Sequence, residues 1–213
     1  MGGNPRSERM IADQLRPHGI VDPRVLEVMR QVPREEFVQP EHRDLAYADH
    51  PLAIGGGQTI SQPLVVAAMT QAADPRPGEV ALEVGSGSGY QAAVLARLCD
   101  HVVGVERDAE LAARGERTLA RLGFTNAEIH HGDGAEGWPG QAPYAVIIVS
   151  AAADNVPPAL VEQLAEGGRL VIPVVRRPDA PQDLLLIRKL GGRLETKALF
   201  PVTFVPLVEG TRG

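Results

Sequence analysis

The sequence predicts an α/β fold: a mostly parallel, doubly wound sheet with a helical N-terminal extension and antiparallel strands at its C-terminal end. From residue 80 to residue 174, short apolar runs alternate with helix-type segments, the pattern of a parallel sheet whose strands are connected by helices. A glycine-rich turn joins the first run to the helix after it, a recurring unit of such sheets. Later, two strand-type runs meet at Gly191-Gly192 and predict a hairpin.

The chain of 213 residues is long enough for one domain with a full core. We expect a single domain, 1–213, in which residues 1–78 form a helical and loop part that covers the site and residues 79–213 form the sheet. The hydrophobic content of 44% and charged content of 23% are those of an ordinary globular protein. The single cysteine, Cys99, excludes an internal disulfide framework and fits a reducing compartment.

The net charge and the hydropathy pattern limit the kinds of binding partner that we expect. The net charge is −6 and no basic patch is evident, so we expect no nucleic-acid partner. No run approaches the ~20 apolar residues of a membrane span, and the N-terminus has no apolar signal region. We therefore expect a cytoplasmic monomer without a membrane partner.

The N-terminal part is predicted to hold helices and loops but no strand within about its first 60 residues. Ser7 is the expected cap of a helix that runs to about His18 and is ended by Gly19. Asp22-Pro23 begins a second helix, which ends near Val32. Residues 34–49 look irregular, and a third helix is expected over 63–73 after the glycine segment 55–57.

The alternating segments between residues 80 and 174 are predicted to form the sheet and the helices that connect its strands. Strands are expected at 80–84, 101–106, 127–131, 144–149 and 169–174, and helices at 89–98, 109–122 and 157–164. Asp108 is the expected N-cap of the second of these helices, and Gly167-Gly168 is expected to form a turn. The run 144–149 is the most apolar in the chain, as for a central strand covered on both faces. Runs 183–190 and 197–205 are the expected antiparallel strands.

The glycine turn places Gly85, Gly87 and Gly89 at alternate positions directly after a strand. The dinucleotide fingerprint G-x-G-x-x-G would need glycine at Tyr90, so a nicotinamide oxidoreductase is disfavoured. With Glu83 in front, the order E-x-G-x-G-x-G resembles the S-adenosylmethionine site of class I methyltransferases. Glu106 ends the next strand, where a carboxylate can accept hydrogen bonds from both ribose hydroxyls.

Nearly the whole chain, from about Ile20 to Leu207, resembles the protein-L-isoaspartate O-methyltransferases. The matching stretches are 32–38, 46–49, 57–63, 83–93, 132–134, 142–144 and 204–207. The stretch Gln58-Thr59-Ile60-Ser61-Gln62-Pro63 is the most specific of them, because ordinary class I methyltransferases lack it. Small departures from the family pattern stand at Ala53, Ser86, Ser150 and Val175.

The resemblance implies a protein repair reaction: transfer of the methyl group of S-adenosylmethionine to the free α-carboxyl of L-isoaspartyl residues in damaged proteins and peptides. It also implies which residues bind the cofactor: Gln58, Thr59, Ile60, Ser61, Glu83, Gly85, Ser86, Gly87, Ser88, Gly89, Glu106, Arg107, Gly132, Asp133 and Gly134. Asp133 is expected to accept a hydrogen bond from the adenine amino group, while Glu83 either holds the glycine loop or binds the methionine amino group. Tyr47, Asp49 and Ile54 are expected to shape the peptide site, and a structural role is an equal alternative for Tyr47 and Asp49.

Ser61 is the expected residue at the reacting centre. The acceptor carboxylate, with a pKa of roughly 3.5–4, is ionised at neutral pH and needs no general base. The enzyme must instead orient it toward the methyl group and exclude water. The Ser61 hydroxyl can hydrogen-bond the carboxylate, although the same hydroxyl could cap the helix that begins at Pro63.

Other interpretations stay open at this point. A related O-methyltransferase would methylate an ordinary aspartate side chain of a specific peptide to drive succinimide formation. Such relatives often carry an added C-terminal segment, and this chain ends soon after Leu207. A nucleic-acid methyltransferase is opposed by the acidic charge and by Ser150-Ala151-Ala152-Ala153 where an Asn/Asp-Pro-Pro-aromatic motif would stand. A binding module without catalysis is opposed by the intact motif residues. No metal is expected, because His130 and His131 are adjacent and point to opposite faces of a strand.

Overall fold

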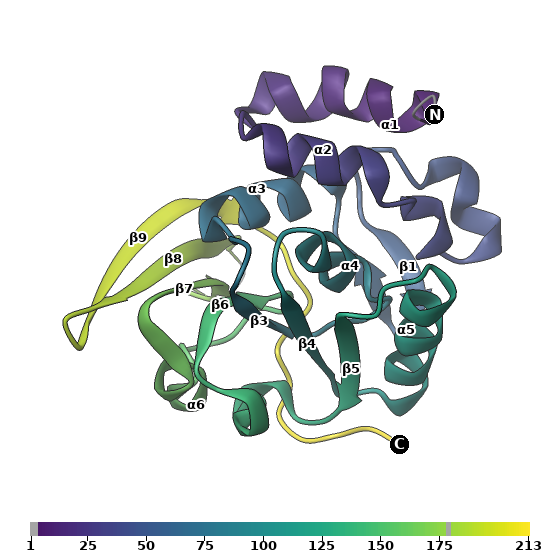
Figure 1. Ribbon diagram of the computed structural model, residues 1–213. Helices are drawn as coiled ribbons and strands as arrows, with labels where there is room; N and C mark the ends of the chain where they lie inside the picture. Colours follow the sequence, from purple (N-terminus) through teal and green to yellow (C-terminus); the bar gives the residue numbers. More distant parts are fainter. Residues whose placement is uncertain (1–3, 178–179) are drawn as a thin grey trace.

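The computed structural model describes residues 4–177 and 180–213 and contains a seven-stranded sheet. Helices cover both faces of this sheet (Figure 1). The strand order is β5-β4-β3-β6-β7-β8-β9. The first five of these strands run parallel to their neighbours, and β8 and β9 are antiparallel. This confirms the expected sheet, with the antiparallel hairpin at one edge.

The parallel strands are β3 (Val80–Val84), β4 (His101–Glu106), β5 (Ala127–His131), β6 (Tyr144–Val149) and β7 (Leu164–Val174). The chain builds from β3 outward through β4 to β5, then crosses back to place β6 on the other side of β3. The strand order therefore reverses between β3 and β6, and in open α/β sheets ligands bind beyond the carboxyl ends of the strands at such a point.

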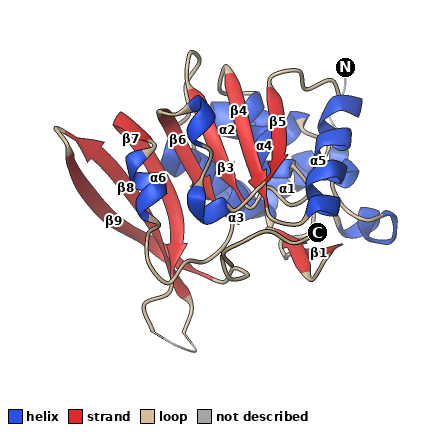
Figure 2. Cartoon of the chain, turned by 90° about the horizontal axis from the view of Figure 1, so that it is seen from below, coloured by secondary structure: helices blue, strands red, loops and turns tan. Residues whose placement is uncertain are grey.

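The two faces of the sheet carry separate cores. Ala81, Val102 and Val146 face a large cluster that includes the N-terminal helices, α3, α4 and α5. Leu82, Val103 and their neighbours pack with Leu160 of α6 on the opposite face. Figure 2 shows α6 and α4 on opposite sides of the strands. The helices are α3 (Pro63–Ala73), α4 (Tyr90–Ala96), α5 (Ala109–Arg121) and α6 (Pro158–Glu162).

Local capping chemistry sets several helix starts. Asp108 accepts hydrogen bonds from the amides of Glu110 and Leu111 and begins α5, as expected. Asp22 likewise caps α2 (Pro23–Gln31). The first helix differs from expectation: Asn4, and not Ser7, caps α1 (Pro5–Met10), because the Asn4 side chain accepts from the Arg6 amide.

The rest of the N-terminal part is made of short turns. The chain continues from α1 through a π-helical turn, Ile11–Leu15, and a 3-10 turn, Arg16–His18, which ends at Gly19. Two further 3-10 helices, Arg34–Glu36 and Pro40–Leu45, fill the region expected to be irregular. In the described ranges, no helix is long and apolar enough to cross a membrane.

The prediction of no strand before residue 60 is wrong. Strands β1 (Leu52–Gly55) and β2 (Gln58–Ile60) form a separate antiparallel pair. Both strands are short, and the three glycines between them obscure any alternation. The glycine segment 55–57 is thus the turn of a small hairpin at the ligand edge of the sheet.

The C-terminal strands are longer and begin earlier than expected. Strand β7 begins at Leu164, so Gly167-Gly168 lies inside a strand with an irregular register and is not a separate turn. Strands β8 (Gln182–Leu190) and β9 (Arg193–Val202) are joined at Gly191-Gly192, which confirms the hairpin. Val205 is not part of β9, because its carbonyl accepts a hydrogen bond from the Ala152 amide beyond the end of β6.

Cys99 is buried, and burial raises the pKa of its thiol to about 12, as expected for a packing residue.

Candidate active site

The glycine loop lies between β3 and α4, where the sequence predicts it. Gly85, Gly87 and Gly89 all have positive φ angles, which non-glycine residues rarely adopt. A Cβ atom on Gly87 would lie 2.9 Å from Cδ1 of Ile54. The loop therefore needs glycine both for its backbone conformation and for its close approach to the β1–β2 hairpin.

Glu106, at the end of β4, fixes the second side of this loop. One of its carboxylate oxygens accepts from the Gly87 amide at 2.8 Å, and the other accepts from the Asp108 amide at 2.9 Å. The residue is buried. Each carboxylate oxygen can accept a second hydrogen bond, so Glu106 can hold the loop and still accept from a hydroxyl pair.

Glu83 lies beneath the loop and is 1% exposed. Its Oε2 atom is buried and has no hydrogen-bond partner in the described part of the chain. Burial raises the pKa of Glu83 well above its usual value, and only contacts with Ser86 and the Ala92 amide oppose this. A cationic group placed beside this oxygen would supply the missing partner and would favour the ionised carboxylate.

Three hollows meet at this edge of the sheet. The loop cavity, about 280 Å³, is walled by residues that include Gln58, Gly85, Gly87, Glu106, Arg107, Gly134 and Val205 to Val208. The outer groove, about 680 Å³, is walled by Pro51, Gln62, Leu64, Val65 and the segment 200–205, among others. The junction cavity, about 30 Å³, is walled by Glu83, the loop residues 85–88 and Tyr90, among others. Thr59 and Ser150 line all three hollows.

Most of the expected cofactor residues come together around these hollows. Gln58, Thr59, Gly85, Gly87, Glu106, Arg107 and Gly134 line the loop cavity, and Ile60, Ser61, Glu83, Ser86 and Ser88 line the junction cavity. Three expected residues, Gly89, Gly132 and Asp133, line none of the three hollows. A Cβ on Gly89 would point toward Ile129 and Leu119, and one on Gly132 would point toward Val105 and Trp138. A Cβ on Gly134 would come within 2.5 Å of Val84, so glycine there permits close approach to β3.

Asp133 is held by the protein itself in this structure. Its Oδ1 accepts from the Ala135 amide at 2.9 Å, and its Oδ2 accepts from the Gly210 amide at 2.5 Å. The second bond fastens the C-terminal segment 205–212, called here the C-terminal strap, beside the loop cavity. Figure 2 shows this segment crossing the ends of the parallel strands toward α5. Contact of Asp133 with adenine stays a prediction.

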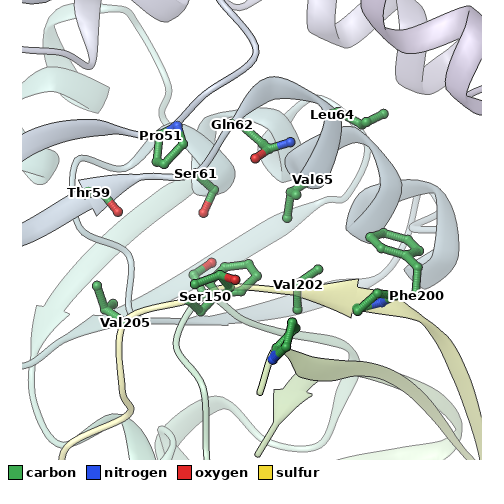
Figure 3. A pocket seen from close by; sticks show the side chains of 14 residues that line it. Pro51, Thr59, Ser61, Gln62, Leu64, Val65, Ser150, Phe200, Val202 and Val205 are labelled. Atoms are coloured by element: carbon green, nitrogen blue, oxygen red, sulfur yellow. The ribbon is translucent and has the colours of Figure 1, made fainter. Parts of the chain in front are cut away.

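Ser61 lies where the outer groove and the junction cavity meet. Its side chain points into the groove (Figure 3). Its backbone carbonyl accepts from the guanidinium of Arg34 at 2.6 Å, and Arg34 also donates to the Ala46 carbonyl. Arg34 is fully buried above the Tyr90 ring, and burial lowers its pKa. A buried cation thus fixes the backbone at Ser61.

The three expected peptide-site residues have mainly structural contacts. Tyr47 is buried, and its hydroxyl donates to Glu35 at 2.5 Å. Ile54 packs under the glycine loop. Asp49 is exposed, and its carboxylate accepts from the Leu64 amide at 3.3 Å. In the described part of the chain, none of the three lines the outer groove.

Sequence reasoning missed several wall residues. Ser150 follows β6, and its place directly after the most apolar strand, where another class of methyltransferases carries its Asn/Asp-Pro-Pro-aromatic motif, was the signal that could have identified it. The segment Val205 to Val208 walls the loop cavity only because the chain returns across the sheet after β9. No local pattern marks that return.

The family model and the relatives that match this chain carry closely matching descriptions. The family model described as protein-L-isoaspartate(D-aspartate) O-methyltransferase matches residues 6–212. The protein-L-isoaspartate O-methyltransferase of Koribacter versatilis is 53% identical over 205 residues, covering 96% of this chain and 91% of that protein. The Synechococcus sp. protein of the same name is 52% identical over 206 residues, covering 94% and 84%.

Solved structures that are similar to this chain include proteins of the same name. A protein-L-isoaspartate O-methyltransferase superposes with a TM-score of 0.84 at 30% identity, covering 94% of this chain and 65% of that one. A Plasmodium falciparum structure, described as a putative protein-L-isoaspartate O-methyltransferase in complex with S-adenosyl-L-homocysteine, superposes with a TM-score of 0.81 at 30% identity. It covers 96% of this chain and 99% of its own.

Proposed function

The chain belongs to the protein-L-isoaspartate(D-aspartate) O-methyltransferase family, and from this premise we propose how its residues carry out the reaction. The reaction is transfer of a methyl group from S-adenosylmethionine to the α-carboxyl of L-isoaspartyl residues, a protein repair step. One observation carries the assignment of roles: the outer groove, whose described wall has no ionisable side chain, meets the junction cavity at Ser61.

The loop and junction cavities have the chemistry that S-adenosylmethionine requires. Glu106 would accept from the ribose hydroxyls, and the apolar strap residues Val205 to Val208 would contact the adenine face. The unpartnered oxygen of Glu83 would receive the methionine ammonium group. Gly87 leaves space where a side chain would obstruct. When bound, the cofactor supplies an activated methyl group on a sulfonium.

The outer groove would hold the acceptor peptide. Its described wall contains hydroxyl, amide and apolar side chains but no ionisable one. A carboxylate placed there would lose bulk water and be oriented by neutral donors, chiefly the Ser61 hydroxyl. Because an anion reacts with a cation, charge is neutralised along the reaction, and removal of water favours that change. Alignment of the reacting groups can supply about 7–11 kcal/mol in favourable cases.

Methyl transfer to a pair of synthetic peptides tests this function. The two peptides are identical except for one normal or one isoaspartyl linkage, and the methyl donor is radiolabelled S-adenosylmethionine. We expect base-labile label only on the isoaspartyl peptide. Label on the normal aspartyl peptide would instead identify the relative that methylates ordinary aspartate. No label on either peptide would contradict the proposed function.

Ser61→Ala tests the proposed role at the reacting centre. We expect turnover of the isoaspartyl peptide to fall at least about 10-fold, because a hydrogen bond to a charged group is lost. The affinity for S-adenosylhomocysteine, measured by calorimetry, should change far less. Equal turnover of the two proteins, with matched thermal unfolding, would remove Ser61 from the mechanism.

Damaged proteins and peptides are the proposed substrates. The monomeric state, a cytoplasmic location and the lack of nucleic-acid or membrane partners stay predictions.

A further inference from the structure

We infer that the Ser150 hydroxyl is a second donor to the acceptor carboxylate, acting from the wall opposite Ser61. This inference rests on the proposed reaction and adds a substrate-contacting residue to it. The first observation is where Ser150 lies relative to the three hollows. Among the described residues, only Thr59 and Ser150 line the loop cavity, the outer groove and the junction cavity together. The methyl group must pass between cofactor and acceptor where these hollows meet, so Ser150 lies at that passage.

The backbone holds Ser150 firmly in this place. Its amide donates to the Val84 carbonyl at 2.8 Å, which ties the residue after β6 to the end of β3. A Cβ on Gly85 would lie 3.6 Å from the Ser150 carbonyl carbon, so the glycine loop packs directly against it. Ser150 is therefore fixed between two central strands at the point where the strand order reverses.

The two serines approach the groove from different elements. Ser61 precedes α3 on one wall, and Ser150 follows β6 on the other (Figure 3). Figure 3 shows both side chains directed into the space between these walls. A carboxylate between them would meet a hydroxyl on each side.

The chemistry of the acceptor calls for more than one such donor. A carboxylate has two oxygens with about four lone-pair sites, and a buried one left without partners is costly. In the described wall of the outer groove no lysine, arginine or histidine is present to supply charge. If Ser61 holds one oxygen, the other needs a neutral donor at the cofactor side of the groove. Ser150 meets this need, and its bond persists in the product because the non-attacking oxygen becomes the ester carbonyl.

The test compares two isosteric replacements. Ser150→Thr keeps the hydroxyl, and Ser150→Val has the same shape as threonine without it. We expect the Thr variant to keep kcat/KM for the isoaspartyl peptide within a few-fold of the parent. We expect the Val variant to lose about 10- to 100-fold relative to Thr, the range for a hydrogen bond to a charged group. Affinity for S-adenosylhomocysteine should be the same in both.

A binding measurement accompanies the kinetics. Calorimetry of the isoaspartyl peptide with protein saturated in S-adenosylhomocysteine should show weaker binding to the Val variant than to the Thr variant. Equal kcat/KM and equal peptide affinity of the two variants would overturn the inference. So would a loss of cofactor affinity in Val that matches the kinetic loss, since Ser150 would then be a cofactor ligand. Activity of the parent protein on the isoaspartyl peptide reports on the proposed function separately.

Discussion

A single buried residue at this site can lower the stability of the protein and still be needed for ligand binding. Glu83 is the plainest case, because its carboxyl is 1% exposed and one oxygen has no partner in the described chain. Burial raises its pKa in the folded protein, whereas in the unfolded chain it ionises near pH 4.3. The free energy of unfolding therefore decreases as pH rises above the pKa of the unfolded state, and it stops decreasing once the carboxyl is ionised in the folded protein too.

We predict that Glu83→Gln is more stable than the parent protein at pH 7 to 8 without ligand, and that the advantage disappears near pH 4. Thermal unfolding across that range measures this. In the same variant, affinity for S-adenosylhomocysteine should fall, because the neutral amide cannot form an ion pair with the methionine ammonium group. Unchanged affinity would mean that Glu83 only supports the glycine loop. Identical pH profiles of the two proteins would contradict the burial argument.

Elements are joined across the sheet by a few charged side chains, and Arg169 of β7 is the main one near the start of β3. Its guanidinium donates to both carboxylate oxygens of Glu79, each at 2.8 Å, and to the carbonyls of Ala73 and Asp74 at the end of α3. Burial alone would raise the pKa of Glu79, but the bonds from Arg169 and from the Arg76 amide outweigh it and lower the pKa. The ionised pair thus anchors α3 and β3 to β7.

We predict that Glu79→Gln lowers the free energy of unfolding at pH 7 by about 1–3 kcal/mol, the range for charge-assisted hydrogen bonds. Because the folded pKa is depressed, this stabilisation is present above the unfolded pKa and is lost as pH falls through the folded pKa. The difference between variant and parent should therefore shrink below about pH 4.5. Denaturant unfolding at several pH values measures it. Glu41→Gln, at an exposed position, is the matched control. A difference that is constant with pH would exclude the ion pair as its source.

At the scale of the whole molecule, the C-terminal strap closes the site. The Leu207 amide donates to the Ala152 carbonyl at 2.7 Å, and the Arg212 amide donates to the Arg107 carbonyl at 2.7 Å. With the Asp133 bond to Gly210, these contacts span the ends of β4, β5 and β6. The wall of the loop cavity at 205–208 is therefore held in place by contacts on both sides of it.

We predict that a chain ending at Val208 binds S-adenosylhomocysteine about 10-fold more weakly, since the hydrogen bonds that Gly210 and Arg212 form with the rest of the site edge are removed. Its melting temperature without ligand should change little, because residues 209–213 are exposed. Calorimetry measures the affinity, and removal of Gly213 alone is the control. Undiminished affinity of the shortened chain would show that the strap end plays no part in the cofactor site.

The sequence by itself determined the alternation of strands and helices, most strand positions, the caps at Asp22 and Asp108, the glycine loop and the family. These features depend on local chemistry: apolar period, capping side chains and the φ angles that glycine permits. Only the tertiary structure decided that Thr59, Ser61, Ser150 and Val205 meet at one place. It also decided that β1 and β2 pair and that the strap crosses the site. Such contacts join residues far apart in the chain, and their free energy comes from packing and pairing that no local pattern records.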